Sequence, residues 1–198
     1  MIEALAARRQ LAGVVIEMAD RGRTTAALSR DASESAVQAA LGWDDAGWPW
    51  SDYRQPVMAA VRAGAPVSGG NLPRSALSAA TADATLDAAV SPQVLQAQRE
   101  AVRSGHCGLL PDSQLAPMAR IQVARDRSMA QALSQAATPG KTVLLIAGGQ
   151  HADPELGVPQ HLPSTLVLRS ERLQAQEPQR DYCEDLRQHF GRQRPRQP

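Results

Sequence analysis

The 198-residue sequence is poor in aromatic side chains, since three Trp, two Tyr and one Phe make up only 3% of it. Alanine and small aliphatic side chains must therefore fill the core, and we expect helices to dominate. No apolar run approaches the roughly 18 residues that a membrane-spanning helix needs. The 43% apolar and 21% charged residues are nevertheless typical of a soluble globular domain.

An excess of one charge is also lacking, because 21 basic residues face 20 acidic ones and the formal net charge is +1. A nucleic-acid partner is therefore not expected, since such binding needs a strongly basic face. Cysteine is scarce as well: Cys107 and Cys183 are too few for a disulfide scaffold, and they leave the redox compartment open.

The first residues carry no basic region, no long apolar core and no lipid-bearing cysteine. As written, the chain therefore predicts a cytoplasmic location. Ile2, Leu5 and Ala6 already have the spacing of a core-facing helix, so we expect an upstream element of the fold to be missing.

Apolar runs that alternate with helical patterns predict a single α/β domain over residues 1–173, with a mostly parallel sheet flanked by helices. Strands are expected at 11–18, 65–70, 141–147 and 164–168. Helices are expected up to about residue 10 and at 24–41 (Asp31 or Ser33 as caps), 51–63, 75–103 with a break at Pro92, and 113–136. Residues 174–198 read as a polar extension that ends in a disordered tail over 191–198.

Polar side chains come at or just after three of these strands, namely Glu17, Asn71 and His151. In parallel sheets ligands bind beyond the carboxyl ends of the strands. We therefore expect these three side chains to surround one crevice.

His151 follows two glycines that allow a sharp turn of the backbone. Such a histidine can ligate a metal or haem or act as a general base, and the alternative is a surface histidine on a glycine turn. For Glu17 we favour a structural ion pair with Arg21 or Arg125, and a ligand or acid–base role is the alternative.

Arg125 falls within the apolar stripe of the predicted helix at 113–136, with Asp126 on the flank of that stripe. An arginine facing the core needs a carboxylate, and Glu17 or Asp126 is the favoured partner. The alternative is an anionic ligand at the rim, such as a propionate, which suits the guanidinium fork.

The Gly-His-Cys-Gly sequence at 105–108 holds His106 beside Cys107. We favour a packed loop with a buried thiol, and a reactive or ligating pair is the alternative. Tyr53 and Tyr182 could each supply a phenolate to ferric haem. The tryptophans at 43, 48 and 50 either form an apolar wall for a macrocycle or, as is more common, pack a long loop onto the domain.

The order of these segments resembles the ChaN-like haem-binding uptake family, within the Tiki/TraB/erythromycin-esterase-like superfamily, from the first residues to about Leu168. The motifs that carry the resemblance are Val-Ile-Glu-Met at 15–18 with Asp20 and Arg21, Trp50 with Tyr53, Asn-Leu-Pro-Arg at 71–74, Gly-His-Cys-Gly at 105–108, Gln122 with Ala-Arg-Asp at 124–126 and Met-Ala at 129–130, Gly-Gly-Gln-His at 148–151 and Leu-Gly-Val-Pro at 156–159.

The resemblance implies an α/β domain and a membrane-anchored bacterial lipoprotein of iron uptake that dimerises around stacked haems with tyrosine ligation. The family's first Gly-Glu-x-His-Asp motif and its strand are absent here, so the chain resembles an N-terminally truncated member. If the true start lies upstream, the resemblance implies a cell-envelope location through a lipid anchor.

The leading prediction is a haem-binding protein without enzymatic turnover, acting as a possible homodimer. Tyr53 or Tyr182 would ligate the iron, and His106 or His151 would support that ligand or the second face. Arg125 would meet a propionate, with Glu17 and Asn71 around the same crevice. The alternatives are a metal-dependent hydrolase-like protein, with a divalent ion at His151 and Glu17, and an inactive truncated member.

Overall fold

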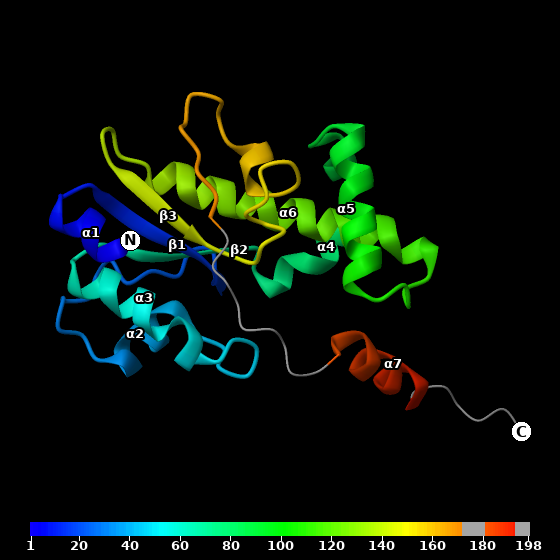
Figure 1. The fold of residues 1–198 in the computed structure, drawn as a ribbon, viewed down its shortest axis with the longest axis horizontal. Helices are drawn as coiled ribbons and strands as arrows, with labels where there is room; N and C mark the ends of the chain where they lie inside the picture. Colours follow the sequence, from blue (N-terminus) through cyan, green and yellow to red (C-terminus); the bar gives the residue numbers. More distant parts are fainter. Residues whose placement is uncertain (172–180, 193–198) are drawn as a thin grey trace, which may run out of the picture.

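The computed structural model describes residues 1–171 and 181–192 and has a three-stranded parallel sheet with helices on both faces (Figure 1). Helix α6 lies against one face with α4 and α5 beside it, and α1, α2 and α3 lie on the other. This arrangement confirms the predicted fold class. The elements are α1 (Ile2–Ala7), β1 (Leu11–Asp20), α2 (Glu34–Leu41), α3 (Trp50–Arg62), β2 (Val67–Asn71), η1 (Arg74–Ala76), α4 (Leu77–Ala82), η2 (Ala84–Ala88), α5 (Pro92–Gly105), α6 (Asp112–Ala136), β3 (Thr142–Ile146), η3 (Val158–His161) and α7 (Tyr182–Arg192).

Strand β1 is the centre of the sheet, in the order β2-β1-β3. Val15 is fully buried and pairs with Ser68 of β2 on one side and Leu145 of β3 on the other. An unbroken apolar run suits such a strand, because helices cover both of its faces. The pairing of β1 with β3 ends at Ile16 and Ile146, so Glu17 leaves the ladder just where the loop after β3 begins.

Helix α6 confirms the helix predicted at 113–136 and packs along all three strands. Its fully buried Val123 belongs to the core that it shares with α4 and η2, and its fully buried Met129 belongs to the core beneath η3. Because α6 connects two parallel positions in the sheet, its N-terminal half lies near the carboxyl ends of the strands.

Two predicted elements are wrong. Residues 164–168 form no strand and Val167 is 90% exposed, because an apolar run alone supplies no neighbouring backbone for a ladder. Residues 24–33 are not helical, because Thr24 bridges Ser68 and the amide of Thr25 donates to the carbonyl of Val67 along the free edge of β2. The helix begins only at Glu34, after the predicted cap Ser33 accepts from the amide of Ala36.

The C-terminal region holds α7 inside the predicted polar extension. Cys183 on α7 forms a disulfide with Cys107, so the buried free thiol predicted in the 105–108 loop is wrong. The two cysteines stand 76 residues apart, and spacing alone could not pair them. The predicted disordered tail at 191–198 is wrong at its start, because residues 191 and 192 belong to α7, and residues 193–198 lie outside the described residues. The boundary at residue 173 stays a prediction.

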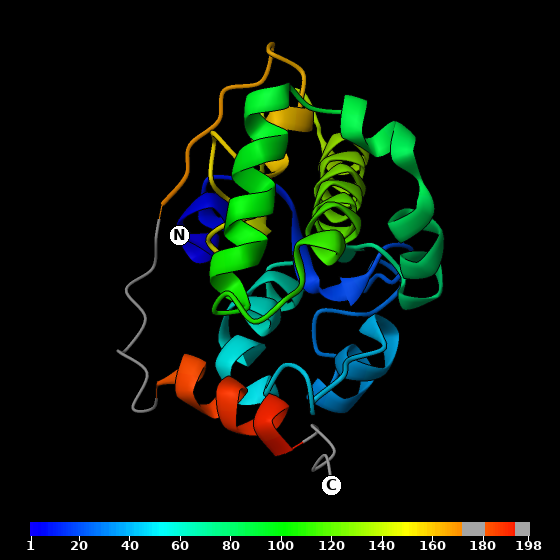
Figure 2. The same cartoon turned by 90° about the vertical axis from the view of Figure 1, so that its right-hand side faces the viewer.

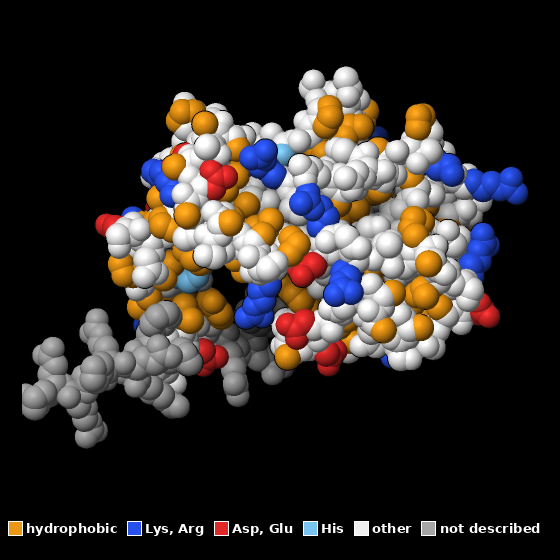
Figure 3. All heavy atoms as spheres, turned by 180° about the vertical axis from the view of Figure 1, so that it is seen from behind, with side chains coloured by type: hydrophobic (Ala, Val, Ile, Leu, Met, Phe, Trp, Pro, Cys, Tyr) orange, Lys and Arg blue, Asp and Glu red, His pale blue; other side chains and the backbone are white. Residues whose placement is uncertain are grey.

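Basic, acidic and hydrophobic side chains are interspersed on the face shown in Figure 3, which bears no broad patch of one charge. The predicted absence of a nucleic-acid partner stays a prediction.

Replacement of Val15 by Ala should lower the free energy of unfolding by about 2–3 kcal/mol, because it removes two buried carbon atoms and leaves a cavity in the central strand. The matched change Val167→Ala, at a site that is 90% exposed, should alter it by less than about 0.5 kcal/mol. Urea unfolding of both variants checks this, and equal losses would contradict the core that we describe.

Candidate functional site

A buried histidine lies between two carboxylates at the carboxyl ends of the strands. The Nδ1 atom of His151 lies 2.6 Å from Oδ1 of Asp126, and its Nε2 atom lies 3.5 Å from Oε1 of Glu17. The side-chain amide of Gln98 donates to Oδ2 of Asp126 at 3.1 Å and to the carbonyl of Leu156 at 3.0 Å. This buried network joins β1, α5, α6 and the loop after β3, and it confirms that Glu17 and His151 converge.

The network carries more negative than positive charge, because two carboxylates surround one imidazole. All of its members are buried, with exposed fractions of 4% for Glu17, 0% for Asp126 and 8% for His151. Burial disfavours the charged imidazole, but the hydrogen bond to Asp126 and the charges of Asp126 and Glu17 outweigh it and raise the pKa of His151. Burial also raises the pKa of Asp126, against the hydrogen bond from His151, so the network retains protons.

Glycines give His151 its position. The amide of Gly148 donates to Oε2 of Glu17 at 2.7 Å, which ties the start of the loop to β1. The amide of Val158 donates to the carbonyl of His151 at 2.8 Å and closes the loop. A Cβ at Gly157 would collide with that carbonyl, so only glycine allows the closure.

Two predicted site residues each have a polar side-chain atom without a hydrogen-bond partner in the described chain, although both atoms are shielded from solvent. They are Oδ1 of Asn71, at the end of β2, and Nε of Arg125, on α6. The positive charge of Arg125 reaches His151 and favours its neutral form. The predicted ion pairs of Glu17 with Arg21 or Arg125, and of Arg125 with Asp126, do not form among the described residues, because both carboxylates face His151. A free acceptor and a free guanidinium donor thus lie at the same edge of the sheet.

Tyr53 on α3 stands beside this edge. Burial and the charges of Glu17 and Asp52 raise the pKa of its phenol. The rings of Trp43 and Trp48 have their centroids 5.7 Å and 6.0 Å from the Tyr53 ring. Among the described residues, none forms a hydrogen bond to the phenol oxygen of Tyr53, so that oxygen is free to take a ligand.

The tryptophans hold the loop that precedes α3. The indole N–H of Trp43 donates to the carbonyl of Trp48 at 2.8 Å, and that of Trp50 donates to Glu34 at 2.8 Å. The predicted packing of a long loop onto the domain is therefore what the structure shows. The same packing fixes two of the indole rings against Tyr53.

Two predicted site residues lie elsewhere. His106 follows the end of α5, eight residues beyond Gln98 and so about 12 Å further along the helix axis, with its Nδ1 2.8 Å from the carbonyl of Val102. Tyr182 begins α7, where its side chain is 60% exposed next to the disulfide. In the described part of the chain, neither forms a hydrogen bond or an ion pair with His151 or Glu17.

Sequence reasoning missed the central role of two residues. Asp126 was placed on the flank of the α6 stripe, yet its side chain is wholly buried. Gln98 was not singled out, although it caps Asp126 from α5. Of these two residues, only Asp126 could have been recognised from the sequence. It lies next to the apolar stripe of the helix, and a carboxylate that faces the core must have a partner.

The donor set does not form a metal site on its own. Within residues 1–171 and 181–192, no group of three or more His, Cys, Asp and Glu side chains could hold a metal ion. Both imidazole nitrogens of His151 already face carboxylates.

Comparison with known proteins identifies one matching family and one similar solved structure. A family profile described as haem-binding uptake, Tiki superfamily, ChaN matches residues 1–162. The fold is similar to a solved structure described as cofacial haem binding to ChaN of Campylobacter jejuni, with a TM-score of 0.66 and 23% identity. The similarity covers 81% of this chain and 65% of that one, so the present chain spans less than two thirds of its length. No curated protein matches significantly.

The raised pKa of His151 predicts a pH dependence of stability. The folded chain binds more protons than the unfolded chain above the ordinary histidine pKa of 6.5, so the network's contribution is complete below that value and is lost as pH rises through the raised pKa. Urea unfolding at increasing pH should show this fall. The control variant His161→Gln should show the same fall in stability. Burial and Arg127 lower the pKa of His161, so this residue affects stability only below pH 6.5.

Replacement of Asp126 by Asn should lower the pKa of His151 below its ordinary value, because burial then acts with less opposing charge. Histidine proton shifts followed by NMR against pH measure this value directly. The matched change Asp185→Asn, at an exposed position of α7, should leave it unaltered. An unchanged His151 pKa in the Asp126 variant would refute the pairing.

Proposed function

Since the chain belongs to the ChaN haem-binding uptake family of the Tiki superfamily, we propose that it binds haem at the carboxyl edge of its sheet. Its role would be non-enzymatic, in bacterial haem and iron acquisition. The observation that carries this proposal is the free phenol of Tyr53, flanked by two indole rings beside the buried network. Haem supplies a ferric iron that accepts a phenolate ligand.

Tyr53 fits the role of axial ligand better than the other candidates. Its oxygen has no hydrogen bond to give up among the described residues, whereas His151 would have to leave two carboxylates. The raised pKa keeps the phenol protonated in the absence of iron, so binding would release a proton. The flanking rings of Trp43 and Trp48 offer apolar surface to a flat macrocycle.

The polar ends of haem also find partners at this edge. Arg125 presents a shielded Nε donor without a partner, and a propionate carboxylate is an acceptor that matches a guanidinium. The free Oδ1 of Asn71 accepts a hydrogen bond from a water or from a protonated propionate. Glu17, Asp126 and His151 would hold the edge in shape without touching iron.

A divalent-metal hydrolase has less support, because within residues 1–171 and 181–192 no group of three or more His, Cys, Asp and Glu side chains could hold a metal ion. The disulfide supports a cell-envelope location, since such bonds persist in oxidising compartments. Among the described helices, none has the length and apolar character to cross a membrane. The cofacial haems described for the Campylobacter jejuni protein support a homodimer that faces two haems toward each other.

Replacement of Tyr53 by Phe should weaken haemin binding by about tenfold or more and remove the tyrosinate band of the ferric complex. Tyr182→Phe, the matched change at the other candidate ligand, should leave both unchanged. Absorbance titration with haemin, followed at the Soret band, measures the affinity. The absence of a Soret shift with the wild-type chain would refute the haem proposal. A loss of haemin affinity in the Tyr182 variant alone would identify Tyr182 as the axial ligand instead of Tyr53.

Replacement of Arg125 by Gln should lower haemin affinity by about tenfold, which corresponds to the loss of one charge-assisted hydrogen bond. The same variant should bind haemin dimethyl ester as well as the wild type does, because the ester has no carboxylate. Equal losses with both ligands would show that Arg125 acts through the shape of the site and not through a propionate.

A further inference from the structure

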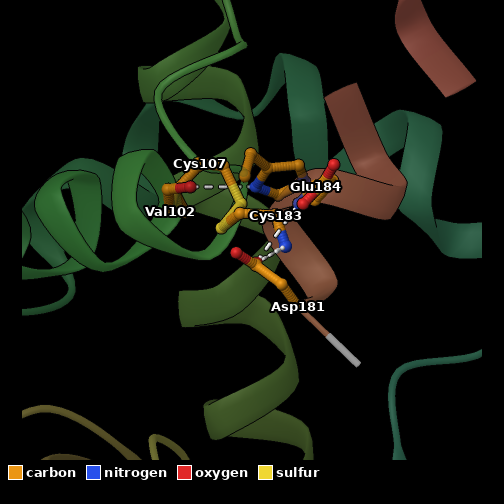
Figure 4. Close-up of a disulfide and its surroundings, with 6 residues drawn as sticks. Val102, Cys107, Asp181, Cys183 and Glu184 are labelled. Carbon is orange, nitrogen blue, oxygen red and sulfur yellow. Dashed lines mark hydrogen bonds between the residues drawn. A yellow bond between two sulfur atoms is a disulfide. The ribbon is translucent and has the colours of Figure 1, made fainter. Parts of the chain in front are cut away.

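Helix α7 is attached to the rest of the described chain through the disulfide between Cys107 and Cys183, whose Cα atoms lie 5.6 Å apart (Figure 4). Over residues 182–188, where side chains are described, no hydrogen bond or ion pair reaches another element. At the start of α7, the backbone amides of Cys183 and Glu184 donate to Oδ1 of Asp181, at 2.8 Å and 3.2 Å. None of these seven side chains is buried.

The body of the protein does not need α7 for its core. The three clusters of buried hydrophobic residues all lie between Leu11 and Val158. Helix α7 has 11 residues, and isolated helices shorter than about 12–15 residues are marginal in water. The helix therefore depends on its anchor, whereas the body does not.

The two halves of the disulfide differ in how firmly they are held. Cys107 adopts φ 56° and Gly108 φ 69°, a left-handed turn that ends α5. The turn is fixed by bonds from the amide of Cys107 to the carbonyl of Ser104 and from the amide of Gly108 to that of Arg103, both at 2.9 Å. The body thus presents one sulfur on a rigid turn, and the other sits on a helix whose described side chains, at 182–188, make no other bond to the body.

We propose that this disulfide is a redox-sensitive latch that fixes α7 and that its reduction frees α7 while the body stays folded. Both cysteines are partly exposed, so a small dithiol reductant can reach them. One thiolate of the reductant attacks a sulfur and breaks the Cys107–Cys183 bond, forming a mixed disulfide. Its second thiolate resolves this intermediate, so two electrons and two protons reach the cysteines and the reductant leaves as a disulfide.

The latch has a consequence for the ligand that rests on the proposed function. Helix α7 lies on the side of the molecule toward which the strands run (Figures 1 and 2). A latched α7 would hinder a haem from leaving on that side of the molecule, and a released α7 would not. Reduction should then raise the rate of haem dissociation by about tenfold, since changes around a site act mostly on dissociation.

Hydrogen exchange of the full chain, with and without a phosphine reductant, tests the latch. The amides of α7 should exchange about tenfold faster or more after reduction, while those of β1 stay protected. Cys183→Ser should show fast exchange in α7 without reductant and no further change with it. Unchanged protection of α7 after reduction would overturn the proposal, and so would loss of protection in β1.

Transfer of haem to apomyoglobin, measured for the oxidised and reduced chain, tests the consequence. A faster transfer after reduction supports control of the site by the latch, and equal rates overturn that control. If the oxidised wild type does not bind haemin, only the proposed function is refuted, because the hydrogen-exchange experiment tests the latch without haem.

Discussion

The arrangement of the carboxyl edge depends on one interaction, the placement of His151 between Asp126 and Glu17. The three side chains come from α6, β1 and the loop after β3, and each is at most 8% exposed. Loss of one partner of a buried charge pair leaves the other uncompensated, which costs about 3–5 kcal/mol. The network therefore fixes how α6 and the loop meet the sheet, and this relation places Arg125, the neighbour of Asp126, at the rim.

The polar groups at the carboxyl ends of the strands fall into two sets: an inner set that is hydrogen-bonded and an outer set, the rim, without partners. Inside, the imidazole, two carboxylates, the Gln98 amide and the Gly148 amide satisfy one another. At the rim, the phenol of Tyr53, the Nε of Arg125 and the Oδ1 of Asn71 are without partners in the described chain. Buried polar atoms are normally paired, so the unpaired Nε of Arg125 and Oδ1 of Asn71 support the ligand site that we propose.

The sequence predicted the parts of the fold that local patterns control. The apolar runs of β1 and β3 and the periodicity of α6 identified the core layers, and the rule about strand ends brought Glu17 and His151 together before any geometry was known. The helix predicted over residues 24–33 and the strand predicted over 164–168 were wrong, because the conformation of both segments depends on whether a neighbouring backbone offers hydrogen bonds. Asp126, Gln98 and the Cys107–Cys183 pair were missed because each gains its role from a partner at least 25 residues away.

The same geometry favours haem over a metal at His151 in the function that we propose. A metal at His151 would need a free imidazole nitrogen, whereas both ring nitrogens face carboxylates, whose charges raise the pKa of the ring. In the proposed complex a porphyrin would need no group from inside the network, because its iron, its flat faces and its propionates would meet the phenol, the indoles and the guanidinium outside it. In the proposed complex the network would therefore support the rim and supply no group to the ligand.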